Sequence, residues 1–163
     1  MLSADPRVVP EAVQLDRLSY DEASGTLKDP KVLIAGMPGK NDHNSGRLKI
    51  GPDNKLYYTI GDGGKDQLGN WCIPIEAQRL PTGEEIAAGN WVAYQGKSLR
   101  LNPDGSIPED NPEIDGVTSH VFTYGHRNMQ GIDFGPDGTL YAHATTTCLV
   151  FDVHHKPPGG ATE

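Results

Sequence analysis

Two residues of the sequence are of the types that form a proton-transfer site, and they flank one stretch of chain. His43 precedes residues 48–60, and Asp62 follows them, 19 residues after the histidine. Because a strand-turn-strand unit returns the chain to where it began, the imidazole and the carboxylate can meet. A carboxylate on one ring nitrogen fixes the tautomer and raises the basicity of the other nitrogen. The pair predicts a general base with its orienting group; a surface-loop histidine beside a turn aspartate is the alternative.

A second polar pair precedes a similar unit later in the chain. Arg127 stands five residues before Ile132, as His43 stands five residues before Leu48. Arg127 is followed by Asn128, which places a permanently charged guanidinium beside a carboxamide that can both donate and accept. These groups suit the stabilisation of a developing oxyanion. An arginine in a structural salt bridge is the alternative interpretation.

The elements that must position these side chains are repeated. Residues 48–57 align without gaps on residues 132–141, with five identities and two apolar exchanges in ten positions. Each copy predicts two strands around a Gly-Pro-Asp turn, in which proline presets φ and aspartate caps the turn. A related turn at residues 103–105 predicts a third hairpin of this kind, and residues 15–35 predict a further hairpin.

Repeated hairpins of this kind indicate a β-propeller, in which each blade is a four-stranded sheet. The 20 Gly and 13 Pro are spread along 163 residues, so turns should be frequent and helices few and short. At about 40 to 45 residues per blade, we expect an all-β fold with an incomplete set of about three blades. Residues 66–94 are predicted to form an inserted loop. Equivalent loops of neighbouring blades open on one face, so His43 and Arg127 should line the same face.

Composition excludes other classes of protein. The formal net charge is −8, whereas a nucleic-acid binder needs a basic stripe. No apolar run approaches the roughly 18 to 20 residues of a membrane span, and residues 1–7 show no export signal. Cys72 and Cys148 allow at most one disulfide, and we expect both thiols to be unpaired and buried.

Four motifs around these residues closely resemble the soluble quinoprotein glucose dehydrogenases and the related aldose and sorbosone dehydrogenases. The motifs are residues 41–48, 57–62, 96–108 and 125–131, and the resemblance covers some four fifths of the chain. It implies a six-bladed propeller that uses pyrroloquinoline quinone (PQQ) and calcium. It further implies a periplasmic or secreted enzyme that oxidises an aldose sugar at C1 to the lactone and passes the electrons to an external acceptor.

The resemblance also implies a role for individual residues. His43 matches the base that takes the proton of the C1 hydroxyl while hydride passes to the quinone, and Asp62 matches its orienting carboxylate. Arg127 completes the catalytic set. The implied substrate contacts are Asp42, Gln67, Leu68 and Arg127, and the implied cofactor contacts are Arg127 and Asn128; no metal ligand is assigned.

The resemblance ends after residue 141, where a loop that helps to bind calcium in the family is replaced by a different sequence. We divide the chain into an N-terminal extension, residues 1–14, a partial propeller, residues 15–147, and a divergent, flexible tail, residues 148–163. Exposed blade edges should favour association into a homo-oligomer. Because most groups that hold the quinone lie in blades outside this sequence, we expect negligible turnover by this chain alone. A non-catalytic propeller fragment or interaction module is the alternative function.

Overall fold

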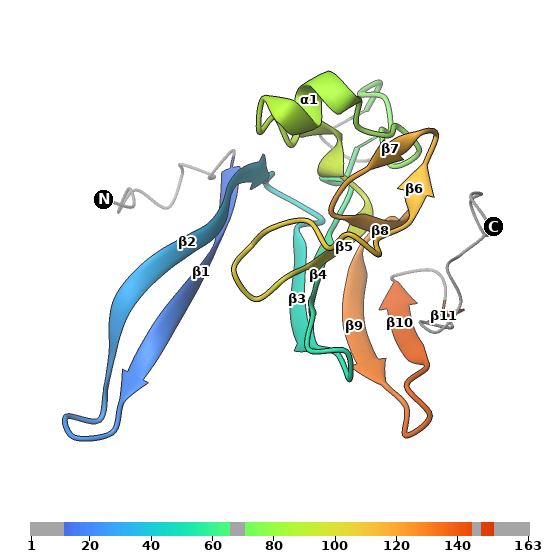
Figure 1. The fold of residues 1–163 in the computed structure, drawn as a ribbon. Coiled ribbons are helices and arrows are strands. Elements are labelled where there is room, and N and C mark those ends of the chain that lie inside the picture. The colour runs from blue at the N-terminus through green and yellow to red at the C-terminus, as the bar shows by residue number, and fades with distance from the viewer. Residues whose placement is uncertain (1–11, 66–70, 145–147, 152–163) are drawn as a thin grey trace.

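The structure is a computed structural model that describes residues 12–65, 71–144 and 148–151, the last range for its backbone alone. Strands dominate these residues (Figure 1), as the frequency of turns predicted. The helical elements are short: α1 (Gly83–Ala87) and the 3-10 turn η2 (Val92–Tyr94), both within the predicted inserted loop. Within the described residues no helix has the length and apolar character needed to cross a membrane.

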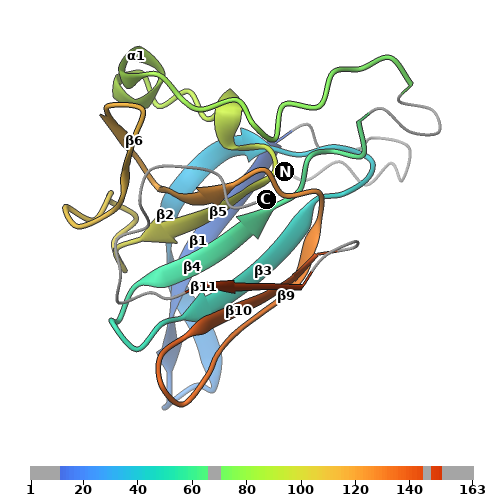
Figure 2. The same cartoon turned by 90° about the vertical axis from the view of Figure 1, so that its right-hand side faces the viewer.

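A four-stranded antiparallel sheet forms the centre of the molecule. Its strand order is β3 (Ser45–Ile50), β4 (Leu56–Ile60), β5 (Lys97–Leu101) and β8 (Val121–Tyr124). Figure 2 shows these strands side by side. A small hairpin, β6 (Glu113–Ile114) with β7 (Val117–Thr118), is inserted before the last strand. The central sheet is therefore one complete blade of the predicted kind.

An incomplete sheet lies on either side of the central sheet (Figure 1). On one side β1 (Ala12–Asp21) and β2 (Thr26–Pro38) form a two-stranded ribbon. On the other side β9 (Met129–Phe134), β10 (Leu140–Ala144) and β11 (Cys148–Phe151) form a three-stranded sheet. The described residues thus contribute to three consecutive blades, which confirms the predicted incomplete propeller.

The sequence repeat corresponds to equivalent strands. In the alignment of the two copies of the repeat, β9 corresponds to β3 and β10 corresponds to β4. Their turns have the same backbone bonds, since Gly51 N donates to Lys55 O at 2.9 Å and Gly135 N donates to Thr139 O at 2.8 Å. The two hairpins predicted from the repeat are confirmed.

The third predicted hairpin is wrong, although its turn is right. Asn102 N donates to Ser106 O at 3.0 Å, as in the two repeat turns, but β5 then pairs with β8 and not with the residues after the turn. The reason is that β8 and the residues before it occupy this edge of β5, where Arg100 N donates to His120 O at 2.8 Å. The side-chain amide of Asn111 donates to Arg100 O at 3.0 Å and to Ser119 O at 2.8 Å, so it joins the end of β5 to the residues that lead into β8.

Pairing extends beyond both ends of residues 15–147, which the sequence marked as the propeller. Ala12 pairs with Pro38 at the start of the ribbon, and β11 pairs with β10 along four positions.

The expectation of buried thiols is wrong for Cys72, which is exposed and unpaired because it lies in the irregular segment after β4. The side chain of Cys148 lies outside the described residues.

A buried charged cluster fixes the first repeat turn to the core. Tyr57 is buried between Phe122 and Phe134, with ring centroids at 5.4 and 5.0 Å. Its hydroxyl donates to Asp53 Oδ2 at 3.0 Å, and Arg100 Nη2 donates to the same oxygen at 2.8 Å. Partial burial alone would raise the pKa of Asp53, but the hydrogen bonds from Arg100 hold that pKa below its ordinary value.

We expect Asp53→Asn to lower the free energy of unfolding by about 2 kcal/mol, because the buried Arg100 loses a charged partner. Asp137→Asn is the matched control, since Asp137 is the repeat equivalent of Asp53 and accepts hydrogen bonds from Thr139 in an exposed turn. Chemical denaturation followed by circular dichroism measures both variants. Equal losses of stability at the two positions would contradict this account of the cluster.

Candidate active site

Three residues predicted for the site lie at one end of the central sheet and of the neighbouring sheet formed by β9, β10 and β11. His43 lies two residues before β3, Arg127 two residues before β9, and Asp62 two residues after β4. β3 and β9 are repeat equivalents, and β4 runs antiparallel to β3. The starts of β3 and β9 and the end of β4 therefore lie on the same face of the propeller, as the repeat predicted.

The carboxylate of Asp62 joins the other two side chains. Asp62 Oδ1 lies 2.9 Å from His43 Nδ1, and Arg127 Nη1 donates to Asp62 Oδ2. The Asp62 side chain has 0% exposure, against 12% for His43 and 23% for Arg127. Burial of a carboxylate requires such partners. Of the two alternatives for Arg127, the salt bridge is present, and it forms with the carboxylate of Asp62.

Main-chain hydrogen bonds tie the three segments together. Asp62 N donates to Arg127 O at 2.9 Å, and Gly63 N donates to His43 O at 3.3 Å. Gly64 N donates to Asp62 Oδ1 at 3.0 Å, and Arg127 Nη1 also donates to Lys65 O at 2.7 Å. The relative positions of imidazole, carboxylate and guanidinium are therefore set by the backbone of two blades as well as by side chains.

The imidazole is held so that its two nitrogens differ in environment. With Nδ1 donating to Asp62, the lone pair lies on Nε2, the nitrogen that can accept a proton. Asp42 stands beside it: Asp42 Oδ1 accepts from His43 N at 2.8 Å and lies 4.0 Å from His43 Nε2. The Asp42 side chain is 44% exposed, so its carboxylate lies at the rim of the site.

Asn128 braces the turn that carries His43. Its Oδ1 accepts from Ser45 N at 3.1 Å and from Ser45 Oγ at 2.9 Å, and also from Gln130 Nε2 at 3.0 Å. His43 and Ser45 have φ of 47° and 57°, in the left-handed region that non-glycine residues seldom adopt. Ser45 could not be identified from the sequence, since a serine at the start of a strand carries no signal that it bonds to a distant carboxamide.

Two buried basic residues, Lys97 and His126, lie beside Arg127 or interact with its neighbour in the chain. Lys97 Nζ donates to Ala77 O at 2.6 Å and to Gln95 O at 2.7 Å, and burial lowers the pKa of Lys97 to about 7. His126 N donates to Gly96 O at 3.0 Å, and burial lowers the pKa of the His126 imidazole to about 4. His126 is therefore uncharged at neutral pH. Neither Lys97 nor His126 was assigned a role from the sequence.

The structure does not place two of the predicted sugar contacts, and the described residues show no site for a metal ion. Gln67 and Leu68 lie outside the described residues. In the part of the chain that the structure describes, no group of three or more His, Cys, Asp or Glu side chains could hold a metal ion. The candidate site therefore consists of His43, Asp62 and Arg127, with Asp42 at its rim and Asn128 behind it.

Close approach at Gly61 provides a test of this arrangement. A Cβ at Gly61 would lie 1.7 Å from His43 O, a backbone atom, whereas a Cβ at Gly83 in α1 would meet nothing within 4 Å. We expect Gly61→Ala to lower the free energy of unfolding by about 2 kcal/mol or more, because the turn that carries His43 must move. Gly83→Ala is the control and should be neutral or slightly stabilising. Thermal unfolding measures both, and unchanged stability in Gly61→Ala would refute the packing.

The sequence of the chain is similar to those of known sugar dehydrogenases. The family model for glucose/sorbosone dehydrogenase matches residues 4–145. Quinoprotein glucose dehydrogenase B of Acinetobacter calcoaceticus is 50% identical over 132 residues, which are 81% of this chain and 28% of the relative. Aldose sugar dehydrogenase YliI of Escherichia coli K12 is 30% identical over 129 residues, 77% of this chain and 29% of the relative. The chain thus spans less than a third of the length of these relatives.

Solved structures show the same relationship. A PQQ-bound aldose sugar dehydrogenase from Streptomyces coelicolor superposes with a TM-score of 0.60 at 32% identity, over 79% of this chain and 33% of that one. The apo form of the soluble aldose sugar dehydrogenase of Escherichia coli has the same fold, with a TM-score of 0.62 over 84% of this chain and 36% of that one. The chain therefore belongs to the glucose/sorbosone dehydrogenase family of quinoprotein sugar dehydrogenases and has part of their β-propeller fold.

Proposed function

We propose that this chain carries the base and the sugar-binding side of an active site that oxidises an aldose at C1 to the lactone, with PQQ as the hydride acceptor. The observation that supports this most directly is the buried Asp62 carboxylate, which bonds the imidazole of His43 and the guanidinium of Arg127 at one edge of two blades. Membership of a family of sugar dehydrogenases supports the class of substrate.

The described residues fit one of the two implied cofactors. Arg127 and Asn128 provide guanidinium and carboxamide groups, which suit the oxygens of a quinone that carries carboxylates. When bound, PQQ would supply the two-electron acceptor for the hydrogen at C1 of the sugar. Calcium is proposed from the resemblance alone, and the described residues contain no group of three or more acidic, histidine or cysteine side chains that could hold a metal ion.

The proposed chemistry of this chain is proton transfer. His43 Nε2 accepts the proton of the C1 hydroxyl, and the resulting imidazolium is stabilised by the Asp62 carboxylate on Nδ1. Because Asp62 is buried and fixed by the backbone, the imidazole keeps one tautomer and one orientation. The guanidinium of Arg127 carries the positive charge that favours negative charge developing on a reacting oxygen.

The sugar-binding side is proposed from the rim of the site. Asp42 has an exposed carboxylate beside His43, and a carboxylate accepts hydrogen bonds from sugar hydroxyls. By resemblance to the family, Gln67, Leu68 and Arg127 would also contact the sugar. An external electron acceptor and a periplasmic or secreted location follow from the same resemblance.

A chimera tests the roles of these residues in a complete propeller. Residues 12–144 would replace the corresponding part of the Acinetobacter enzyme, and we expect glucose-dependent reduction of a dye. His43→Gln in the chimera should lower kcat by about 100-fold to 10,000-fold, while PQQ binding measured by equilibrium dialysis stays unchanged. His143→Gln, at an exposed position of β10, is the matched control. Full turnover in the His43→Gln chimera would overturn the assignment of the base.

We expect the isolated chain, supplied with PQQ and calcium, to show no measurable sugar oxidation. Hydride transfer requires donor and acceptor atoms within about 3 to 3.5 Å, and a misplacement of about 1 Å lowers the rate about 100-fold. The described residues supply groups for the proton and the sugar but few groups that would fix a quinone. The measurement is dye reduction by the purified chain, and robust turnover there would show that one side of the site is sufficient.

A further inference from the structure

Lys97 is a buried amine that the proposed proton transfer does not use. It is the first residue of β5, in the middle of the central sheet, and it has 0% exposure. Its Nζ donates to Ala77 O at 2.6 Å and to Gln95 O at 2.7 Å, and it lies 3.5 Å from Glu76 O. An ammonium has three N–H groups. Three carbonyl oxygens are therefore within reach of as many donors.

The hydrogen bonds of Lys97, more than its packing, are what another residue could not supply. Its hydrogen-bond partners among the described residues are carbonyl oxygens, and none of them is a carboxylate that would neutralise the charge. Holding an amine in such a place is unfavourable, and burial lowers the pKa of Lys97 to about 7. A methionine of similar length would fill the space without this penalty. It could not donate to the carbonyls.

One of the carbonyls bound by Lys97 also holds the chain just before Arg127. Ala77 O accepts from Gly125 N at 2.9 Å as well as from Lys97 Nζ. Gly125 has φ of 87°, and a Cβ there would lie 2.7 Å from Gln78 Nε2, so the two segments are in close contact. Lys97 therefore fixes the acceptor of the Gly125 amide, two residues before Arg127.

The second carbonyl lies next to a glycine that holds the following residue. Lys97 Nζ binds Gln95 O, and Gly96 comes directly after Gln95. Gly96 O accepts from His126 N at 3.0 Å. A Cβ at Gly96 would lie 2.5 Å from both Ala77 Cβ and His126 O, so there is no space for one. The ammonium thus holds in place the acceptors of two consecutive amides.

The same backbone bonds continue to the candidate site. Gly96 N donates to Gly61 O at 3.0 Å, and the next residue, Asp62, donates through its backbone N to Arg127 O at 2.9 Å. The guanidinium of Arg127 in turn donates to the carboxylate of Asp62. Lys97 is therefore connected through the backbone to both members of the buried ion pair.

We propose that Lys97 is a positioning residue for Arg127. Its ammonium holds the two segments that accept from the amides before Arg127, and this keeps the guanidinium on the Asp62 carboxylate. Lys97 acts through Arg127 and has no contact with the reacting atoms. The effect on catalysis rests on the proposed function, whereas the effect on the backbone before Arg127 does not depend on it.

Hydrogen exchange of backbone amides in the full chain tests the effect on the backbone. In Lys97→Met we expect the amides of Gly125 and His126 to exchange about 10-fold faster, because their acceptors lose a common anchor. The turn amides of Gly51 and Gly135, which bond within their own hairpins, should be unchanged. Unchanged exchange at Gly125 and His126 would overturn the proposal, whatever the chain catalyses.

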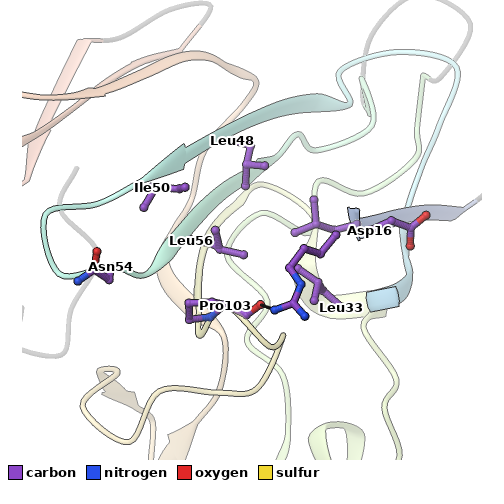
Figure 3. A pocket seen from close by; sticks show the side chains of 9 residues that line it. Asp16, Leu33, Leu48, Ile50, Asn54, Leu56 and Pro103 are labelled. Atoms are coloured by element: carbon purple, nitrogen blue, oxygen red, sulfur yellow. Dashed lines mark hydrogen bonds between the residues drawn. The ribbon is translucent and has the colours of Figure 1, made fainter. Parts of the chain in front are cut away.

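A matched control removes a cation that donates to a carbonyl elsewhere. An apolar groove of about 350 Å³ lies between the ribbon and strands β3 and β4, and Figure 3 shows its lining side chains, among them Leu48 and Leu56. There Arg17 Nη1 donates to Pro103 O at 3.4 Å, the hydrogen bond drawn in Figure 3. Arg17→Met should leave the exchange of both amides before Arg127 unchanged.

A second variant separates positioning from general stability. Lys97→Gln keeps two N–H donors on a shorter side chain, so its amide exchange should lie between those of the wild type and Lys97→Met. Circular dichroism verifies that both variants keep the β fold. Unfolding of both variants, or equally fast exchange in the two, would show that Lys97 only fills the core and would overturn the proposal.

Turnover in the chimera tests the effect on catalysis. Lys97→Met should lower kcat by about 10-fold to 100-fold, since a misplacement of about 1 Å lowers a rate about 100-fold, while Arg17→Met should leave kcat unchanged. In an Arg127→Met background Lys97→Met should cause no further loss, because its effect passes through Arg127. An independent effect would add in both backgrounds.

The outcomes for Lys97 and for the proposed function can be told apart. Additive losses of kcat, or full turnover in Lys97→Met despite faster exchange, would overturn the positioning role. A wild-type chimera without turnover would overturn the proposed function, and amide exchange in the full chain would still decide whether Lys97 holds the backbone before Arg127.

Discussion

The buried carboxylate of Asp62 holds together the loops at one end of two neighbouring blades. Its side chain has no exposure to solvent, and a charge removed from water needs charged or hydrogen-bonding partners. Those partners come from separate parts of the chain: His43 ahead of β3, Arg127 ahead of β9, and the amide of Gly64 after β4. Two neighbouring blades must therefore keep their relative position, because a shift of either one would leave a buried charge without compensation.

The same carboxylate connects the fold to the proposed chemistry. Asp62 uses one oxygen for the imidazole and the other for the guanidinium, so base and cation are fixed relative to each other by a single rigid group. Asn128 adds a second constraint, since its carbonyl oxygen holds the backbone amide of Ser45, the residue that begins β3. A residue that resemblance assigns to the cofactor thus also holds the turn of the base, which joins the two sides of the proposed site in one hydrogen-bonded unit.

The incomplete sheets impose a different constraint. A complete blade buries both faces of its inner strands, whereas here the face of β3 and β4 toward the ribbon is exposed along the groove, and Tyr141 is half exposed on β10. The aromatic contact between Tyr57 and Phe134 shows how such faces are satisfied where two blades are present.

The sequence predicted the local turns correctly, but it did not predict which strands pair after them or which side chains become buried. The turn at residues 102–106 has the predicted bonds, yet no hairpin follows it because β8, from a later part of the chain, pairs with that edge of β5. Cys72 was expected inside on the tendency of its residue type, yet it is exposed because its segment is irregular. The first error arises because a distant segment decides which strand pairs with β5, and the second because residue type alone does not determine burial.

The sequence by itself determined the paired hairpins, the propeller class and the proximity of His43 to Asp62, because strand alternation, Gly-Pro-Asp turns and hairpin closure act within about 20 residues. The tertiary structure alone decided that Arg127 bonds to Asp62 across 65 residues of chain, and that Asn128 braces Ser45 across 83 residues. These contacts depend on how one blade packs against the next. No local pattern encodes that packing, because it is set by the burial of Tyr57 and of the Asp62 carboxylate and by the contact of Tyr57 with Phe134 of the next sheet.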